Sequence, residues 1–227
     1  MENLDNFFRK YNGSYYFFIA IILAVCTVMI SIIFYIQIDP TFTIVTHYIS
    51  HLGSTPTGAQ EGKLYPSAVV FNTGFTILVI FRILLTLFLA RYLQIKGASK
   101  KLIILGIILA FFSSSGSLIV AVVPFSVSLS IHMLGALILF VGTVFSGSMF
   151  TIIELKTPNI PRYLPFIIFI NVVVYLIFAT LLIGEGMNFA PDGSSVIWEW
   201  FAFLSSLSWL FVHGVYTYKN PVFMPKN

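Results

Sequence analysis

Two histidines four residues apart are the clearest candidates for chemistry in this chain. His47 and His51 lie in the stretch HYISHLGSTPTG (residues 47–58), and the chain of 227 residues has only four histidines. Residues at i and i+4 share one face of a helix, so the two imidazoles could bind a common metal ion. The spacing by itself is not specific, and the glutamate of an H-E-x-x-H motif is absent.

A third histidine, His132, extends this hypothesis. It lies just inside a later apolar segment, in PFSVSLSIHMLGALILFVGTVF. Two or three histidines with a carboxylate could hold zinc and activate water for lipid hydrolysis. The carboxylates that the topology below puts on the same side are Asp39, Glu61, Glu185, Asp192 and Glu199. The alternative is that the imidazoles of His47, His51 and His132 bond to loop carbonyls and lipid headgroups.

Polar residues inside apolar segments are the next group. Asn72 lies one turn into the second apolar segment, at a depth comparable to that of His132, so these two residues and the loop could close a polar pocket. Arg82 lies deeper, where an unpaired charge costs at least about 2.5 kcal/mol. We expect Arg82 to pair with Glu154, with Asn171 or with lipid phosphate. A structural role for Arg82, Glu154 and Asn171 is favoured over a transport relay, which needs a chain of ionisable groups.

The elements that position these residues are six apolar segments. Hydrophobic residues make up 58% of the chain, charged residues only 9%, and the mean hydropathy is +0.97. This composition indicates a membrane protein, in which runs of about 20 apolar residues are helical. We predict an all-α fold, a single six-helix transmembrane domain over residues 1–227. The expected spans are 15–36, 68–93, 102–123, 130–152, 164–183 and 196–216.

Basic residues set the expected orientation. Ten of the twelve lysines and arginines fall on one side of this topology, Lys63 falls on the other, and Arg82 lies within a span. The positive-inside rule therefore predicts a multi-pass integral membrane protein with both termini in the cytoplasm. The ten residues are Arg9, Lys10, Arg91, Lys96, Lys100, Lys101, Lys156, Arg162, Lys219 and Lys226. No basic stripe with interleaved aromatic residues suggests nucleic-acid binding.

The histidine motif then falls in a long outer loop of about 31 residues between the first two spans. Ile44, Tyr48 and Leu52 recur every four residues, which predicts one apolar face of a short helix. His47 and His51 would project from a neighbouring face of that helix, and Gly53 would end it.

Several of these motifs resemble the DRAM family of autophagy modulators and its Frag-type, Sfk-type and prokaryotic six-span relatives. The resemblance is carried by THYISHLGSTP, FNTGF and HMLGALILFVGTVF, with Ile49, Ser50 and Gly53 in the first motif. Further matching positions are Pro56, Phe71, Asn72, His132, Gly135, Ala136 and Phe140. The residue after the serine is often acidic in the family, whereas here it is His51. The resemblance implies six spans with cytoplasmic termini and a lipid-related function, without an agreed catalytic mechanism.

From these observations we expect an integral membrane protein of lipid handling or membrane organisation without catalysis of its own. Ser50, His51, Asn72 and His132 would line a pocket for lipid headgroups at the non-cytoplasmic face. Titration of the imidazoles near neutral pH would make such binding pH-sensitive. One alternative is a zinc-dependent intramembrane lipid hydrolase using His47, His51 and His132. A second is a small-solute transporter. Membrane lipids are the expected partners, and the sequence leaves the oligomeric state open.

Overall fold

Six long helices form the body of the protein in a computed structural model, which describes residues 2–56, 59–60 and 63–223. Each helix is long and apolar enough to cross a membrane, which confirms the predicted all-α bundle of six spans. Several helices run two to four residues past the predicted span at one or both ends. Their bounds are α2 (Tyr15–Tyr35), α3 (Pro66–Ile95), α4 (Lys100–Val122), α5 (Leu129–Lys156), α6 (Tyr163–Gly186) and α7 (Val196–Lys219).

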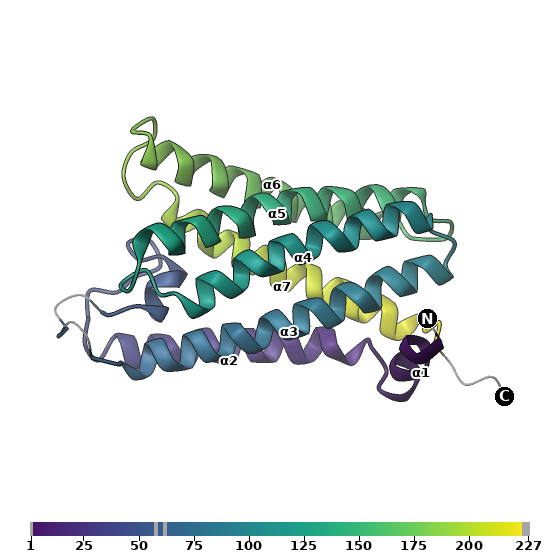
Figure 1. The fold of residues 1–227 in the computed structure, drawn as a ribbon, viewed down its shortest axis with the longest axis horizontal. Helices are drawn as coiled ribbons and strands as arrows, with labels where there is room; N and C mark the ends of the chain where they lie inside the picture. The colour runs from purple at the N-terminus through teal and green to yellow at the C-terminus, as the bar shows by residue number, and fades with distance from the viewer. Residues whose placement is uncertain (1, 57–58, 61–62, 224–227) are drawn as a thin grey trace.

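The helices form a closed ring in the order of the chain. Each packs against the next, and α7 returns to pack against α2 (Figure 1). The closest approach is between α4 and α5, where a Cβ atom on Gly116 would lie 2.3 Å from the backbone nitrogen of Leu139. Gly142 meets the backbone of Ser113 in the same way. Small residues therefore set the contact between these two helices, as is common in membrane bundles.

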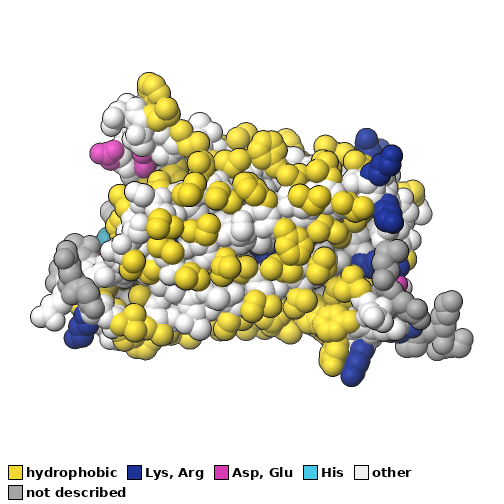
Figure 2. All heavy atoms as spheres, viewed as in Figure 1, with side chains coloured by type: hydrophobic (Ala, Val, Ile, Leu, Met, Phe, Trp, Pro, Cys, Tyr) yellow, Lys and Arg dark blue, Asp and Glu magenta, His cyan; other side chains and the backbone are white. Residues whose placement is uncertain are grey.

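Charge separates the two ends of the bundle. Lysine and arginine gather at the end that carries both termini, whereas apolar side chains cover the flank (Figure 2). We call this the basic end. The opposite end carries the loop after α2 and is called the η1 end, after the 3-10 helix η1 (Ile49–Gly53) in that loop. Exposed residues such as Ile22, Ile108 and Phe145 form part of the apolar flank that a lipid bilayer would cover.

A short helix that the sequence analysis did not predict closes the basic end. Helix α1 (Glu2–Lys10) packs its Phe8 side chain, which has no exposed surface, into the main core. Asp5 accepts two hydrogen bonds of 2.6 Å from the guanidinium of Arg91 on α3. This bidentate pair lowers the pKa of Asp5 through the hydrogen bonds and holds α1 against the bundle.

The loop helix predicted around His47 forms only in part. Helix η1 begins at Ile49, and it ends at Gly53 as expected, but residues 44–46 form a turn and residue 47 a bend. The exposed fraction of Ile44 is 50%, so this residue of the predicted apolar face does not pack against the bundle. Contacts with α7, described below, shape this segment more strongly than its local periodicity does.

Candidate functional site

The four residues predicted to line an outer pocket do lie at the η1 end, but several of their polar groups bond within the protein. The Asn72 amide donates to the carbonyl of Gly53 over 2.9 Å and so holds η1 against α3. Nδ1 of His132 lies 2.8 Å from the carbonyl of Val123 and donates to it, at the turn between α4 and α5. Asn72 and His132 thus hold loop backbone in place. Ser50 borders the cavity described below.

His51 and His132 meet around one aromatic ring. The His51 ring stacks on Phe125 with 5.4 Å between centroids, and the His132 ring lies edge-on to Phe125 at 6.4 Å. Burial and the neighbouring His47 lower the pKa of His51 to about 4. His51 is therefore neutral above pH 5, and its predicted titration near neutral pH is wrong.

The histidine pair is not arranged as a metal site. Nε2 of His47 lies 3.4 Å from Asp39, and its Nδ1 lies 2.8 Å from the hydroxyl of Thr46. Its ring meets that of His51 edge-on at 5.7 Å. Within residues 2–56, 59–60 and 63–223, no group of three or more histidine, cysteine or acidic side chains could hold a metal ion. Glu61, a predicted carboxylate ligand, lies outside the described residues. The geometry of the described residues gives the zinc alternative no support.

Arg82 has different partners from those predicted. Its guanidinium donates to Ser117 (2.9 Å) and Ser113 (2.6 Å) on α4, and to Thr143 (3.0 Å) on α5. The predicted bond to Glu154 is wrong, because Glu154 lies eleven residues beyond Thr143, about 16 Å along α5.

The other predicted partner of Arg82, Asn171, is also engaged elsewhere. The amide nitrogen of Asn171 donates to Ser205 (2.9 Å) and Ser206 (3.2 Å) on α7. Tyr175, one turn further along α6, shares a 3.0 Å hydrogen bond with Ser206. Asn171 therefore joins α6 to α7 and does not bond Arg82.

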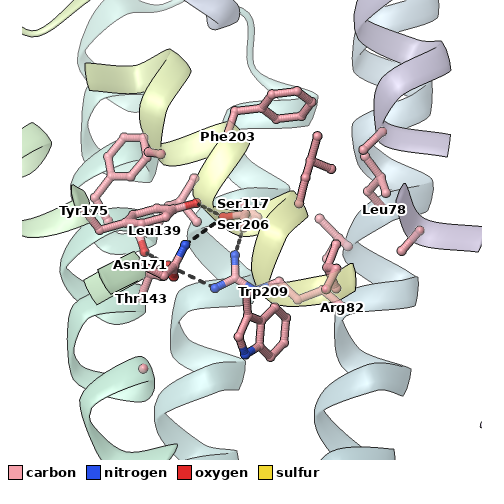
Figure 3. A pocket seen from close by; sticks show the side chains of 18 of the residues that line it. Leu78, Arg82, Ser117, Leu139, Thr143, Asn171, Tyr175, Phe203, Ser206 and Trp209 are labelled. Carbon is pink, nitrogen blue, oxygen red and sulfur yellow. Dashed lines mark hydrogen bonds between the residues drawn. The ribbon is translucent and has the colours of Figure 1, made fainter. Parts of the chain in front are cut away.

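These bonds form one polar layer across five helices, drawn in Figure 3. The Arg82 group from α3, α4 and α5 lies beside the Asn171 group from α6 and α7. The residues of this polar layer are Arg82, Ser117, Thr143, Asn171, Tyr175 and Ser206. All six border one cavity.

The cavity lies inside the helix ring and has a volume of about 270 Å³. Every long helix contributes to its wall, as do Ile49 and Ser50 of η1. Apart from the polar layer and a few other polar groups, the wall is apolar. Arg82 is partly buried and keeps some accessible surface, because it borders this space.

Helix η1 covers the cavity at one end. The Ile49 amide donates to the Glu199 carboxylate over 2.5 Å, and the Trp200 indole donates to the carbonyl of His47 over 2.9 Å. The Tyr48 hydroxyl donates to Glu185 on α6 over 2.8 Å. Burial and the adjacent Glu185 raise the pKa of Tyr48, so this phenol stays protonated.

Sequence reasoning missed that Glu199 faces inward, since it was assigned to the outer surface. A signal was present in the spacing of α7. Glu199, Phe203, Ser206 and Leu210 recur at intervals of four, three and four, which places them on one helix face. All four border the cavity.

Glu154 is held near the basic end by His213, a partner that the sequence did not indicate. Nε2 of His213 lies 3.0 Å from the Glu154 carboxylate, and both side chains have an exposed fraction of 1%. Glu154 thus bonds to a residue of α7 and not to Arg82.

Comparison with protein-family models, with curated proteins and with solved structures finds no match to this chain. The resemblance to the DRAM family therefore stays a prediction from short motifs.

Proposed function

We propose that this integral membrane protein binds a membrane amphiphile inside its helix ring, and that lipid handling is its function. The observation that carries the proposal is the cavity, with its apolar wall and its single layer of polar groups. An apolar occupant would cover the apolar wall and remove its surface from water.

The size of the cavity favours one chain over a whole two-chain lipid. Its volume of about 270 Å³ lies just below the usual range for pockets that hold drug-sized ligands. The section between the polar layer and η1 is lined by aromatic rings of Phe71, Phe75, Phe140 and Phe203. These rings suit an alkyl or isoprenoid chain, whereas a fully polar solute would leave them without favourable contacts.

The η1 end would face the non-cytoplasmic side of the membrane. The basic residues at the opposite end support this orientation through the positive-inside rule. In this arrangement Asn72, His51 and His132 hold the cover of the cavity, and Ser50 reaches its lining. The proposed binding site thus lies beneath the predicted headgroup pocket, inside the ring.

A matched pair of substitutions on α4 tests the proposal. Val120 borders the cavity, whereas Val122 is 61% exposed on the flank. Val120→Phe fills the cavity, and Val122→Phe adds the same volume outside it. We expect single-chain amphiphiles to remain bound to wild type and to Val122→Phe in native mass spectrometry after delipidation. Their loss from Val120→Phe supports the proposal, and equal occupancy in all three proteins overturns it.

A second candidate, transport of a small organic anion, is favoured by the depth of Arg82. It is the seventeenth of the 30 residues of α3, so the polar layer lies near the middle of the bundle, where transporters bind substrate. Uptake of a labelled anion into liposomes that contain the protein would support this function. Tight binding without uptake would leave lipid handling as the function.

A further inference from the structure

We infer that the bound amphiphile is an anion, and that its carboxylate or phosphate monoester binds Arg82 in the polar layer. This inference rests on the proposed function, since it identifies the chemical class of the ligand in the same cavity. Three features of the described residues carry it: the charge of Arg82, the placement of the acidic residues, and the donors of Arg82 that no described residue accepts.

The charge of Arg82 is not compensated within the protein. All three of its hydrogen-bond partners are neutral hydroxyl groups, and no ion pair joins Arg82 to any acidic residue that the structure describes. Hydroxyl groups orient a guanidinium but do not neutralise it. An arginine in this position costs several kcal/mol unless an anion approaches it.

The chain offers no carboxylate at this depth. The six long helices contain three acidic residues, Glu154, Glu185 and Glu199, and each bonds elsewhere. Arg82 follows Asn72 by ten residues, about 15 Å of helix, and Asn72 holds the same η1 helix that Glu199 caps. Glu199 is therefore too distant to pair with Arg82, and Glu154 is similarly far on the other side.

Arg82 is fixed in place with donors to spare. Ser113 and Thr143 both donate to the carbonyl of Leu139, so the acceptors that hold the guanidinium are themselves held. A guanidinium has five N–H donors. Three make bonds to described residues, two from Nη2 and one from Nη1, so the Nε–H and one Nη1–H remain for an anionic oxygen.

Further polar groups face the same space from the opposite wall. Figure 3 shows Asn171, Tyr175 and Ser206 beside the Arg82 group. The Tyr175 hydroxyl can turn from Ser206 to an incoming anion without leaving a buried group unpaired, because Asn171 also donates to Ser206. The polar layer can therefore bind an anion from two sides.

The two ends of the cavity differ in charge, and this sets the direction of the ligand. Glu199 lies at the η1 end and repels an anionic group when it is ionised, whereas Arg82 attracts one. The alkyl chain would then lie in the section lined by phenylalanine, between the polar layer and η1. This section is about 15 Å long, which suits a medium-length single chain.

Trp209 provides a direct probe, because it borders the cavity and is one of three tryptophans in the chain. We would titrate the protein in nanodiscs at pH 8 with 2-bromododecanoic acid and with 2-bromododecanol, in which the bromine lies next to the polar group. This puts the bromine in the polar layer, about one helical turn from Trp209, which follows Ser206 by three residues on α7. Bromine quenches tryptophan fluorescence at close range, and Trp209→Phe reports the signal from the other two. We expect the acid to bind at least about tenfold more tightly than the alcohol, as a charge-assisted hydrogen bond provides.

Substitutions at two arginines separate the effect of the charge in the cavity from that of surface charge. Arg82→Gln should reduce the preference for the acid to near unity, whereas Arg162→Gln, which removes an exposed charge at the basic end, should keep it. Arg82→Lys keeps the charge but has three donors in place of five, so it should still prefer the acid, with weaker binding. If Arg82→Gln does not fold, the comparison of acid with alcohol on wild type still decides the question.

The remaining outcomes overturn either the proposed function or the inference that the ligand is an anionic amphiphile. If neither compound quenches Trp209 beyond its partitioning into empty nanodiscs, the proposed function fails. If both quench equally and Arg82→Gln changes nothing, the inference fails while the proposed function stands. If acetate or inorganic phosphate displaces the brominated acid as well as dodecanoate does, the ligand is a small free anion and not an amphiphile.

Discussion

Glu154 and His213 face each other across 3.0 Å in a region that solvent does not reach. Nδ1 of His213 lies 3.0 Å from the Trp209 carbonyl, an acceptor, so this nitrogen must carry a proton. The bond between Nε2 and Glu154 then requires one further proton, either on the imidazolium or on the carboxylic acid. The pair therefore joins α5 to α7 through a single shared proton. It lies one helical turn beyond Trp209 on α7.

This pair predicts a non-additive pattern of stability. Glu154→Leu or His213→Phe alone leaves its partner buried without a counterpart, and each should destabilise the protein by about 3–5 kcal/mol. The double substitution replaces both groups with apolar side chains and should cost much less than either single change. Reversible unfolding in SDS measures all three values. Additive losses would show that the two side chains do not act as a pair.

A second prediction concerns the anchor of η1. Asn72→Leu keeps a similar side-chain size but removes the donor to Gly53, so the Gly53 carbonyl loses its partner. We expect a loss of about 1–3 kcal/mol in the free energy of unfolding. Gly53→Ala should be at least as harmful, because its Cβ atom would lie 2.4 Å from the Asn72 amide oxygen.

A nearby exposed asparagine supplies the control for this prediction. Asn188, in the α6–α7 connection, is on the surface at the same end of the bundle. Its left-handed backbone, with φ of 60°, suits asparagine or glycine, so Asn188→Gly is the appropriate change there. An unfolding free energy of Asn72→Leu that equals that of wild type would contradict the anchoring role.

The contrast between the spans and the polar layer shows what sequence reasoning can reach. The six helices follow from hydropathy, because the bilayer imposes a length of about 20 apolar residues on each segment. The partners of Arg82 do not follow, since nothing local indicates that Ser117 and Thr143 face α3 while Glu154 faces α7. That choice depends on the rotation of each helix in the ring.

The loop before η1 shows the same limit in another form. Its four-residue periodicity predicted a helix through Ile44 and Tyr48, but tertiary bonds from Trp200 and Glu199 on α7 hold the backbone of His47 and Ile49. Local pattern is a weak guide in a short segment whose hydrogen bonds go to distant residues.

A third prediction follows from the buried imidazole of His51. Its pKa falls to about 4 in the folded protein, mainly because burial penalises the charged form, whereas an exposed histidine titrates near 6.5. Above pH 6.5 both states are neutral and this contribution to stability is fully present. As the pH falls through 6.5 towards 4, the unfolded state binds more protons. The free energy of unfolding should therefore fall, by up to about 3 kcal/mol.

His51→Phe isolates this contribution. Phenylalanine keeps the stacking on Phe125 but cannot take up a proton, so the variant should lose less stability than wild type between pH 6.5 and 4. The measurement is the difference between the two proteins in unfolding free energy at each pH, which cancels the titration of other groups. Parallel pH curves for the two proteins would show that His51 does not titrate in this range.

The fourth prediction is the orientation in the membrane. In a Cys26→Ser background, Lys101→Cys places one thiol at the basic end and Asp192→Cys places one at the η1 end, both at exposed positions. If the basic end is cytoplasmic, a membrane-impermeant maleimide should label Asp192→Cys on intact cells and Lys101→Cys only after permeabilisation. The reverse labelling pattern would show the opposite orientation, with η1 and Glu199 on the cytoplasmic side of the membrane. The anion would then have to reach Arg82 from the opposite leaflet. Labelling of both thiols on intact cells would indicate a mixed orientation, which ten basic residues against one do not predict.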